Sequence, residues 1–394
     1  MAATPQPVRP DVLFVITDFQ VGGSERQLAL LASALAKGGM AVAVFGFIDG
    51  PVRAKLEQAD VEVILAAGAE LSKGSRLTLP LAAGHLFWLM LRRRPRIVHF
   101  FLPQAYLVGA PLAVLARMPV RVMSRRSLNT YQRRRIFGFA ERWCHGFMQA
   151  VIGNSRSVVE QLKAEGVARE RSGLIYNGLD ERQFVASGTR EKIRVRLALR
   201  PAALVMSIVA NLIPYKGHRD LIDALALAAP RLPKGWRLLI VGRDDGIAST
   251  LRQQALSLGV EDNIQFLGPR DDIPEILRAS DIGILSSHEE GFSNVILEGM
   301  AAGLAMVVTE VGGNAEAMID GETGLVVPAG DPKGLSEAIL RLAENAVLRE
   351  KFGETGRRRV AEAFSLDRFV ENHRKLYRAL AVGKRPCDVP EVSV

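Results

Sequence analysis

Two glutamates in the second half of the chain, Glu290 and Glu298, flank a glycine-containing segment and have seven residues between them. The spacing of apolar residues predicts a helix over residues 295–302, so the backbone amides just before it should lie at a helix N-terminus, where an anion binds favourably. A carboxylate can accept hydrogen bonds from both hydroxyls of a vicinal diol. Paired glutamates around an anion site therefore indicate a site for a sugar phosphate. The amides would come from Gly291, Phe292, Ser293 and Asn294.

Further polar groups follow predicted strands in the same half. The apolar segment 204–210 predicts a strand, and Asn211 and Lys216 lie in the loop after it. The Lys216 ammonium, placed between a proline and a glycine, can be presented to phosphate oxygens. Arg243 follows a glycine after the next apolar segment, at a turn where the backbone can pass close to a ligand. These residues extend the predicted sugar-phosphate site.

A pair of glycines, Gly22 and Gly23, follows the first predicted strand and precedes a helix that should begin at Ser24 or Glu25. Glycine lets the backbone approach a ligand closely, and the amides at a helix start suit a phosphate. The spacing is not the Gly-x-Gly-x-x-Gly of dinucleotide-binding domains. A turn that serves only the start of the helix explains the pair equally well.

Short apolar segments alternate with longer amphipathic segments along most of the chain, a pattern typical of parallel sheets covered by helices. We predict an α/β protein with two doubly wound, Rossmann-like domains that face each other across a cleft. Ligands of such sheets bind outside the carboxyl ends of the strands. The predicted strands are Val12–Thr17, Ala41–Phe47, Val61–Leu65, Ile97–Phe101, Val120–Ser124, Ala150–Gly153 and Gly173–Tyr176 in the first half, and Leu204–Ala210, Arg237–Val241, Ile264–Leu267, Ile282–Ser286, Met306–Thr309 and Gly324–Val327 in the second.

The domain boundary is predicted from a loss of regular patterning. Residues 1–187 form the first predicted domain and residues 188–364 the second, with a polar linker at Val185–Arg194. Residues 365–381 predict a helix. The tail 382–394 contains prolines and is predicted to be disordered.

Composition favours an ordinary globular protein, with 48% hydrophobic and 24% charged residues. The two cysteines provide neither a disulfide framework nor a zinc site. The first ten residues lack the apolar core of a signal peptide. The most apolar stretch, residues 77–91, is shorter than the about 20 residues of a membrane span. We therefore expect a soluble, cytoplasmic protein.

The net charge is +9, and the excess of Lys and Arg falls in residues 1–188, with clusters at Arg92–Arg94, Arg125–Arg126 and Arg133–Arg135. A basic surface suits nucleic acid, a phosphorylated substrate or an anionic membrane, although a solvated cationic surface is the alternative. Nucleic acid is not expected, because no basic motif is interleaved with aromatic residues. Residues 129–148 have a basic amphipathic pattern that indicates peripheral contact with an anionic membrane, with a helix packed on the sheet as the alternative.

Taken in their order, these motifs make the sequence resemble the GT-B glycosyltransferases, and within them the retaining family 4, over nearly the whole chain. Glu290 and Glu298 fit that family's pair of glutamates. Gly22, Gly23 and Glu25 fit its N-terminal glycine loop. The other segments that carry the resemblance are Ile152–Ser155, Ile175–Asp180, Lys216–Gly217, Gly291–Asn294 and Val311–Glu316.

The resemblance implies a retaining transferase that moves a hexose or N-acetylhexosamine from a nucleoside-diphosphate sugar, its co-substrate. It implies that Lys216 neutralises the donor diphosphate, that Glu298 holds the ribose hydroxyls, and that Glu290 contacts the transferred sugar. The loop at Gly22 and Gly23 would close on the diphosphate, and the C-terminal helix would cross back to the first domain. The chain contains no Asp-x-Asp, which agrees with transfer that needs no metal and no cofactor.

Two residues depart from the family pattern. Asn211 stands where many members have an arginine, so another cation is needed, with Arg243 or Arg219 as candidates. Arg126 stands close to where many members have a histidine, and we predict that it is a functional residue of the cleft. Its neighbour Arg125 should point elsewhere, because successive side chains alternate along a strand. Pairing with a surface carboxylate is the alternative for Arg126, and His99 is expected to be structural.

The resemblance leaves the acceptor open. A glycan or a polyprenyl-linked acceptor fits, in surface polysaccharide or glycoconjugate biosynthesis at the inner face of the cell membrane. A sugar-nucleotide epimerase with the same fold is one alternative activity. A non-catalytic sugar-nucleotide binding protein is another, prompted by Asn211 and Arg126.

Overall fold

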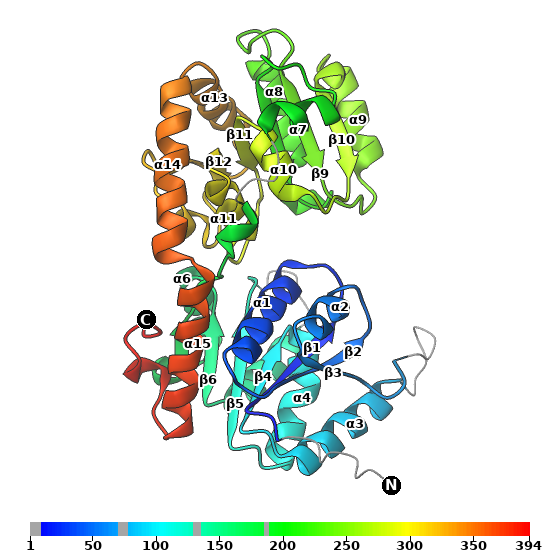
Figure 1. Cartoon of the computed structure of the whole chain (residues 1–394), viewed down its shortest axis with the longest axis vertical. Coiled ribbons are helices and arrows are strands. Elements are labelled where there is room, and N and C mark those ends of the chain that lie inside the picture. Colours follow the sequence, from blue (N-terminus) through cyan, green and yellow to red (C-terminus); the bar gives the residue numbers. More distant parts are fainter. Residues whose placement is uncertain (1–8, 70–77, 129–134, 185–188) are drawn as a thin grey trace. The chain divides into compact units, whose positions relative to one another are not determined.

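The structure is a computed structural model that describes residues 9–69, 78–128, 135–184 and 189–394. The chain divides into two compact units, which are described separately (Figure 1). The first unit comprises Met1–Gly178 and Asp367–Val394, and the second comprises Leu179–Leu366.

The first unit is built on a seven-stranded parallel sheet in the order β3-β2-β1-β4-β5-β6-β7. The strands are added toward one edge of the sheet from β1 to β3 and toward the other edge from β4 onward, as in Rossmann domains. Strand β1 is apolar and buried along nearly its whole length, because helices cover both faces of a doubly wound sheet. The strands are β1 (Val12–Asp18), β2 (Val42–Ile48), β3 (Glu62–Leu65), β4 (Ile97–Phe101), β5 (Val120–Arg125), β6 (Ala150–Gly153) and β7 (Ser172–Leu174).

The helices of the first unit present one apolar face to this sheet. On α1 the buried leucines Leu28, Leu31 and Leu35 recur at helical spacing. Helix α6 begins after Ser155, whose hydroxyl accepts a hydrogen bond from the amide of Val158 at 3.1 Å. The helices are α1 (Gly23–Lys37), α2 (Val52–Glu57), α3 (Thr78–Arg93), α4 (Pro103–Leu115), α5 (Arg135–His145), α6 (Arg156–Ala164) and α15 (Leu366–Ala381).

The tail after α15 has defined structure, so the prediction of a disordered tail is wrong. Residues Pro386–Asp388 form a 3₁₀ turn, and the amide of Leu174 on β7 donates to the carbonyl of Val392 at 2.9 Å. The Val392 side chain is fully buried over Gly173, where a Cβ would lie 2.7 Å from it. The tail has no periodic pattern of its own. Its order comes from contacts with β7 that the local sequence does not reveal.

The second unit contains a six-stranded parallel sheet in the order β10-β9-β8-β11-β12-β13, again with the reversal of a Rossmann domain. Its strands are β8 (Val205–Val209), β9 (Arg237–Val241), β10 (Ile264–Gly268), β11 (Ile282–Leu285), β12 (Ala305–Thr309) and β13 (Gly324–Val327). Its helices are α7 (Arg190–Arg196), α8 (His218–Ala228), α9 (Ala248–Ser257), α10 (Ile273–Ala279), α11 (Asn294–Ala301), α12 (Asn314–Ala317), α13 (Pro332–Ala343) and α14 (Ala346–Ala363). The two sheets confirm the predicted α/β fold with two Rossmann-like domains.

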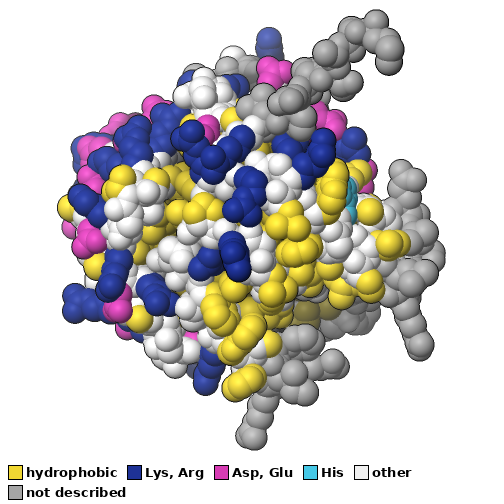
Figure 2. All heavy atoms as spheres, turned by 90° about the horizontal axis from the view of Figure 1, so that it is seen from below, with side chains coloured by type: hydrophobic (Ala, Val, Ile, Leu, Met, Phe, Trp, Pro, Cys, Tyr) yellow, Lys and Arg dark blue, Asp and Glu magenta, His cyan; other side chains and the backbone are white. Residues whose placement is uncertain are grey.

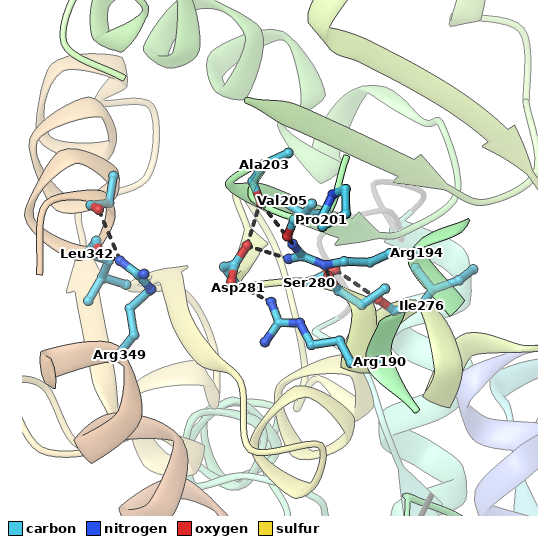
Figure 3. Close-up of polar contacts among 12 residues, drawn as sticks. Arg190, Arg194, Pro201, Ala203, Val205, Ile276, Ser280, Asp281, Leu342 and Arg349 are labelled. Carbon is cyan, nitrogen blue, oxygen red and sulfur yellow. Dashed lines mark hydrogen bonds and ion pairs between the residues drawn. The ribbon is translucent and has the colours of Figure 1, made fainter. Parts of the chain in front are cut away.

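Helix α7 corrects the predicted linker, whose residues 185–188 lie outside the described part of the chain. Arg194 on α7 is buried and donates to the carbonyls of Pro201 at 2.6 Å and Ala203 at 3.1 Å (Figure 3). It also pairs with Asp281 at 2.8 Å, and the same carboxylate accepts the amide of Val205 at 2.8 Å. A polar segment therefore forms a helix here because its arginine ties it to the start of β8.

Candidate functional site

Lys216 and Glu290 meet at one end of the second sheet. Lys216 ends a 3₁₀ turn, Pro214–Lys216, after β8, and Glu290 lies in the loop between β11 and α11. The Lys216 Nζ lies 2.6 Å from the Glu290 Oε1, and the Ser287 hydroxyl donates to the same oxygen at 2.7 Å. The two side chains are only 18% and 11% exposed. The structure thus joins two residues that the sequence analysis assigned to one site.

Two glycines allow these loops to pack closely. Gly217 has a φ of 67°, and a Cβ there would lie 1.8 Å from the carbonyl oxygen of Ser286. Gly312, in the loop after β12, has a φ of 52°, and a Cβ there would lie 1.8 Å from the carbonyl oxygen of Glu290. A side chain at either position would be strained in backbone conformation and would also collide with backbone. The glycines therefore fix where Lys216 and Glu290 lie.

Helix α11 begins just beyond Glu290, one residue earlier than predicted. Ser293 is the N-cap of this helix, but its side chain accepts no hydrogen bond from the first turn. Backbone amides at a helix N-terminus are suited to an anion. Phe292 is buried and packs on Phe364, with 5.5 Å between ring centroids. Glu298 lies one turn into the helix and is 7% exposed. The amides of Gly291–Asn294 therefore lie at the start of the predicted helix, and Glu298 lies within it.

Asn211 and Arg243 lie on adjacent loops after β8 and β9. The Asn211 Oδ1 accepts a hydrogen bond from the backbone amide of Arg243 at 3.2 Å. The Arg243 guanidinium is 61% exposed and pairs with Asp245 at 2.8 Å. The structure therefore brings the backbone of Arg243 to Asn211. Among the described residues, the Arg243 side chain forms an ion pair with Asp245 and none with the loops that carry Lys216 and Glu290.

Two polar neighbours of the site were not singled out from the sequence. The Ser287 hydroxyl donates to Glu290, as described above. The sequence feature that could have identified Ser287 is a hydroxyl three residues before a glutamate in a loop. His218 follows Gly217 at the start of α8 and is buried. Burial, aided by the charge of Lys216, lowers the pKa of His218 to about 4, so its imidazole is neutral at pH 7. His218 therefore adds no positive charge beside the lysine.

In the first unit, Gly22 is the N-cap of α1 and Gly23 its first residue. A Cβ at Gly22 would lie 2.2 Å from a carboxylate oxygen of Glu25, so the glutamate folds back over this glycine. Burial raises the pKa of Glu25 to about 7, and the charge of Asp18 adds to the rise. The glycine pair thus shares the start of α1 with a carboxyl group that titrates near neutrality.

Arg126 follows β5 and is partly buried. It donates to the Asn177 Oδ1 at 2.5 Å, and its guanidinium lies 5.6 Å from the ring centroid of Phe101 and 5.8 Å from that of Phe369. No Asp or Glu among the described residues forms an ion pair with it, which disfavours the carboxylate-pairing alternative. Burial lowers the pKa of Arg126 to about 9, which still leaves the side chain charged at pH 7.

Its neighbour Arg125 has a different environment, as predicted from strand alternation. Arg125 is buried and contacts Glu141 at 2.5 Å and Glu165 at 2.9 Å. Burial opposes the ionisation of Glu165, but hydrogen bonds from His145 and Arg125 and their charges outweigh it and lower its pKa to about 2. The two arginines therefore cannot share one role.

The structural expectation for His99 is confirmed. Its Nδ1 lies 2.7 Å from the Tyr377 hydroxyl and its Nε2 lies 2.8 Å from the Ser124 hydroxyl. Burial lowers the pKa of His99 well below its usual range. Both ring nitrogens are thus engaged inside the first unit.

The residues that the structure describes contain neither a metal-binding cluster nor a membrane-spanning helix. No group of three or more His, Cys, Asp and Glu side chains is arranged to hold a metal ion. No helix there is both long enough and apolar enough to cross a bilayer. Residues 129–134, which include part of the basic segment predicted to contact a membrane, lie outside the described ranges.

The two Rossmann-like units define the class of protein, because the solved structures similar to this chain over nearly its whole length include GT-B glycosyltransferases. Anabaena HepE, solved with UDP and glucose, is 25% identical, and the match covers 93% of this chain and 98% of HepE with a TM-score of 0.82. The sucrose-phosphate synthase of Thermosynechococcus elongatus, 20% identical over 95% of this chain and all of that chain, has a TM-score of 0.79 and shows the fold alone.

Family models match both halves of the sequence. The model for glycosyl transferases group 1 matches residues 189–359, and the model for Glycosyltransferase Family 4 matches residues 21–183. The chain belongs to the group 1 glycosyltransferases.

Curated relatives are similar over shorter stretches. The N-acetyl-alpha-D-glucosaminyl L-malate synthase of Bacillus anthracis is 29% identical over 52% of this chain and 52% of its own length. A D-inositol 3-phosphate glycosyltransferase of Corynebacterium efficiens is 33% identical over 47% of this chain and 46% of its own length. The chain spans about half the length of the curated relatives it matches.

Proposed function

We propose that this protein transfers a hexose or N-acetylhexosamine from a nucleoside-diphosphate sugar to a glycan or polyprenyl-linked acceptor, with retention of anomeric configuration and without a metal ion. The observation that carries the proposal is the Lys216–Glu290 pair beside the start of α11, with Glu298 one turn further along. A cation, helix amides and two carboxylates in one place suit the diphosphate and hydroxyl groups of such a donor.

Each group has a role in the proposed reaction. The bond between the anomeric carbon and the diphosphate oxygen breaks, and its electron pair leaves with the nucleoside diphosphate. The Lys216 ammonium and the amides of Gly291–Asn294 stabilise that developing charge. Glu290 holds the sugar hydroxyls while the anomeric carbon gains oxocarbenium character, and Glu298 holds the ribose. The acceptor hydroxyl then bonds to the same face of the sugar and passes its proton to an oxygen of the departing diphosphate.

Relatives support the donor and acceptor classes. HepE was solved with UDP and glucose and also with UDP-glucose, and its fold covers nearly all of this chain. Other relatives include a lipopolysaccharide core biosynthesis glycosyltransferase of Rhizobium meliloti, 33% identical over 46% of this chain. These relatives favour a nucleotide sugar as donor and a glycoconjugate as acceptor.

A panel of sugar nucleotides tests the proposal. The matching donor should raise the melting temperature, because a ligand that binds only the folded state stabilises it. With that donor and a panel of acceptors, the rate at which nucleoside diphosphate is released should be the same with EDTA as without it. Interconversion of the donor sugar without an acceptor would identify an epimerase instead. Binding with no release by any acceptor would indicate a non-catalytic protein. Loss of release in EDTA that Mg²⁺ or Mn²⁺ restores would refute the metal-free mechanism.

A further inference from the structure

Three neighbouring helices of the first unit, α3, α4 and α5, have an unusual surface. Helix α4 packs between the other two and contains no charged residue. A helix that is apolar on all sides is normally buried in a core or in a membrane. Here Leu115, at the end of α4, is 69% exposed. Gln104 is the exposed polar residue of α4, so the outer side of this helix lacks the charged residues that usually cover a surface helix.

The flanking helices expose large aromatic residues. Trp88 on α3 is 54% exposed, and Phe139 and Trp143 on α5 are 76% and 55% exposed. Isolated exposed apolar residues are normal, but a group on adjacent helices marks an interaction surface. Figure 2 shows a face of the molecule on which hydrophobic side chains gather beside Lys and Arg side chains. The other exposed large hydrophobic residues of α3 are Leu79, Leu81 and Leu91.

The same helices are strongly biased in charge. Between Glu70 and Glu141 the sequence contains no Asp or Glu, and Glu141 is itself buried against Arg125. Arg92 lies over the Trp88 ring, 5.6 Å from its centroid. The exposed arginines on or directly after the three helices are Arg92, Arg94, Arg117 and Arg142. This surface is therefore apolar and basic, without exposed carboxylates among its described residues.

We propose that the exposed face of α3, α4 and α5 docks on an anionic lipid bilayer. Tryptophan and phenylalanine insert at the level of the headgroups, and arginines beside them bind the anionic lipids. A second copy of this chain fits less well, because it would bring the same arginines against one another. The proposal concerns a surface outside the proposed donor site and holds whether or not the transfer reaction is as proposed.

Vesicle flotation of the full chain tests the charge dependence. The protein should float with vesicles of phosphatidylcholine and phosphatidylglycerol, and much less with phosphatidylcholine alone. Salt should weaken the binding, because it screens exposed charges. Arg92→Gln and Arg142→Gln should each lower the partition coefficient about fivefold. Equal binding to both kinds of vesicle, or no binding to either, would overturn the proposal.

The tryptophans report which face contacts the lipid. The chain has three, and the third, Trp236, is 4% exposed in the second unit. Brominated phosphatidylglycerol vesicles should blue-shift and quench the emission of the native protein. The same vesicles should leave the emission of a Trp88→Phe, Trp143→Phe double variant unchanged, because its one remaining tryptophan is the buried Trp236.

Matched glutamate substitutions separate the bilayer from other occupants. Phe139→Glu should lower the partition coefficient at least tenfold, while Val347→Glu, at a 75% exposed position on α14, should not. Equal effects of the two variants would contradict the assigned face. So would a Phe139→Glu variant that keeps its vesicle binding but changes its oligomeric state in sedimentation, because that result would indicate a second copy as the occupant.

Discussion

The Lys216 ammonium and the Glu290 carboxylate form an ion pair of 2.6 Å between residues 74 positions apart in the chain. Both groups are largely shielded from water. In such a place the attraction between two charges only partly offsets the cost of removing them from water. A diphosphate would offer Lys216 a second set of acceptors. The ion pair therefore holds the lysine in place and would compete with a bound diphosphate for the positive charge of the lysine.

This competition predicts opposite effects of two substitutions. Lys216→Ala should weaken the binding of a nucleoside diphosphate by about 1.5–3 kcal/mol, since a hydrogen-bonded charge is lost. It should leave the binding of the parent nucleoside unchanged. Glu290→Gln should bind the diphosphate at least as tightly as the native protein and yet lose transfer. Calorimetry with both ligands checks this, with Lys234→Ala, an exposed lysine, as the control. Equal weakening of nucleoside and diphosphate by Lys216→Ala would remove the lysine from the phosphate site.

Glu298 should act on the other half of the nucleotide. Glu298→Ala is expected to cost about 1.5–3 kcal/mol of affinity for the ribonucleotide, through lost bonds from the ribose hydroxyls. The native protein should discriminate against the 2′-deoxynucleotide, and the variant should bind both forms alike. Circular dichroism must show an intact α11, because Glu298 is buried. A variant that folds and keeps the native preference for the ribonucleotide would place Glu298 outside the nucleotide site.

Much of the fold follows from local patterns in the sequence. Strand β13, Gly324–Val327, has the predicted bounds, because a short apolar segment between turns leaves few alternatives. The start of α11 near Asn294 is likewise set by local signals. Asp331 and Asn345 cap α13 and α14, where their side chains accept amide hydrogen bonds at 3.0 Å and 2.9 Å.

The misses depend on contacts between distant residues. Arg194 is buried because its guanidinium donates to Asp281 and to three backbone carbonyls, so a stretch that looks like a linker is a helix. Val392 gains order from Leu174, far away in the chain. The loop positions of Lys216 and Glu290 were predictable as a site, but their ion pair was not, since it depends on how two loops approach each other.

Glu25 predicts a dependence of stability on pH. Its pKa is raised from 4.5 to about 7, so the folded state holds a proton that the unfolded chain loses above pH 4.5. The contribution of this group to stability is thus greatest below pH 4.5 and is lost as pH rises to 7. Glu25→Gln should remove that loss and make the protein more stable than the native form at pH 8. Urea unfolding at pH 5 and pH 8 measures it, with Glu57→Gln, an exposed glutamate, as the control. A native-like fall in stability in the Glu25→Gln variant would assign the titration to another group.

Arg126 and Arg125 should fail in different ways when they are replaced. Arg125→Ala removes the guanidinium from the buried Glu141 carboxylate, which costs about 3–5 kcal/mol of folding stability. Arg126 has two amide oxygens and two aromatic rings as neighbours and no ion-pair partner among the described residues, so Arg126→Ala should cost far less stability. Its cation is available to steady an anionic group, the departing diphosphate or a phosphate of the acceptor. Arg126→Ala should therefore lower kcat with the fold intact.

Arg126→Lys refines the test, because lysine restores the charge but not the planar guanidinium. Partial rescue of turnover by lysine would indicate a role of the charge, whereas equal loss in both variants would indicate that the fork geometry is needed. Arg169→Ala, an exposed arginine of the same unit, is the control for surface charge. If Arg126→Ala keeps native kcat and KM while its melting temperature is unchanged, the arginine has no part in transfer. The cation that compensates for Asn211 must then be sought at Arg219 or Arg243.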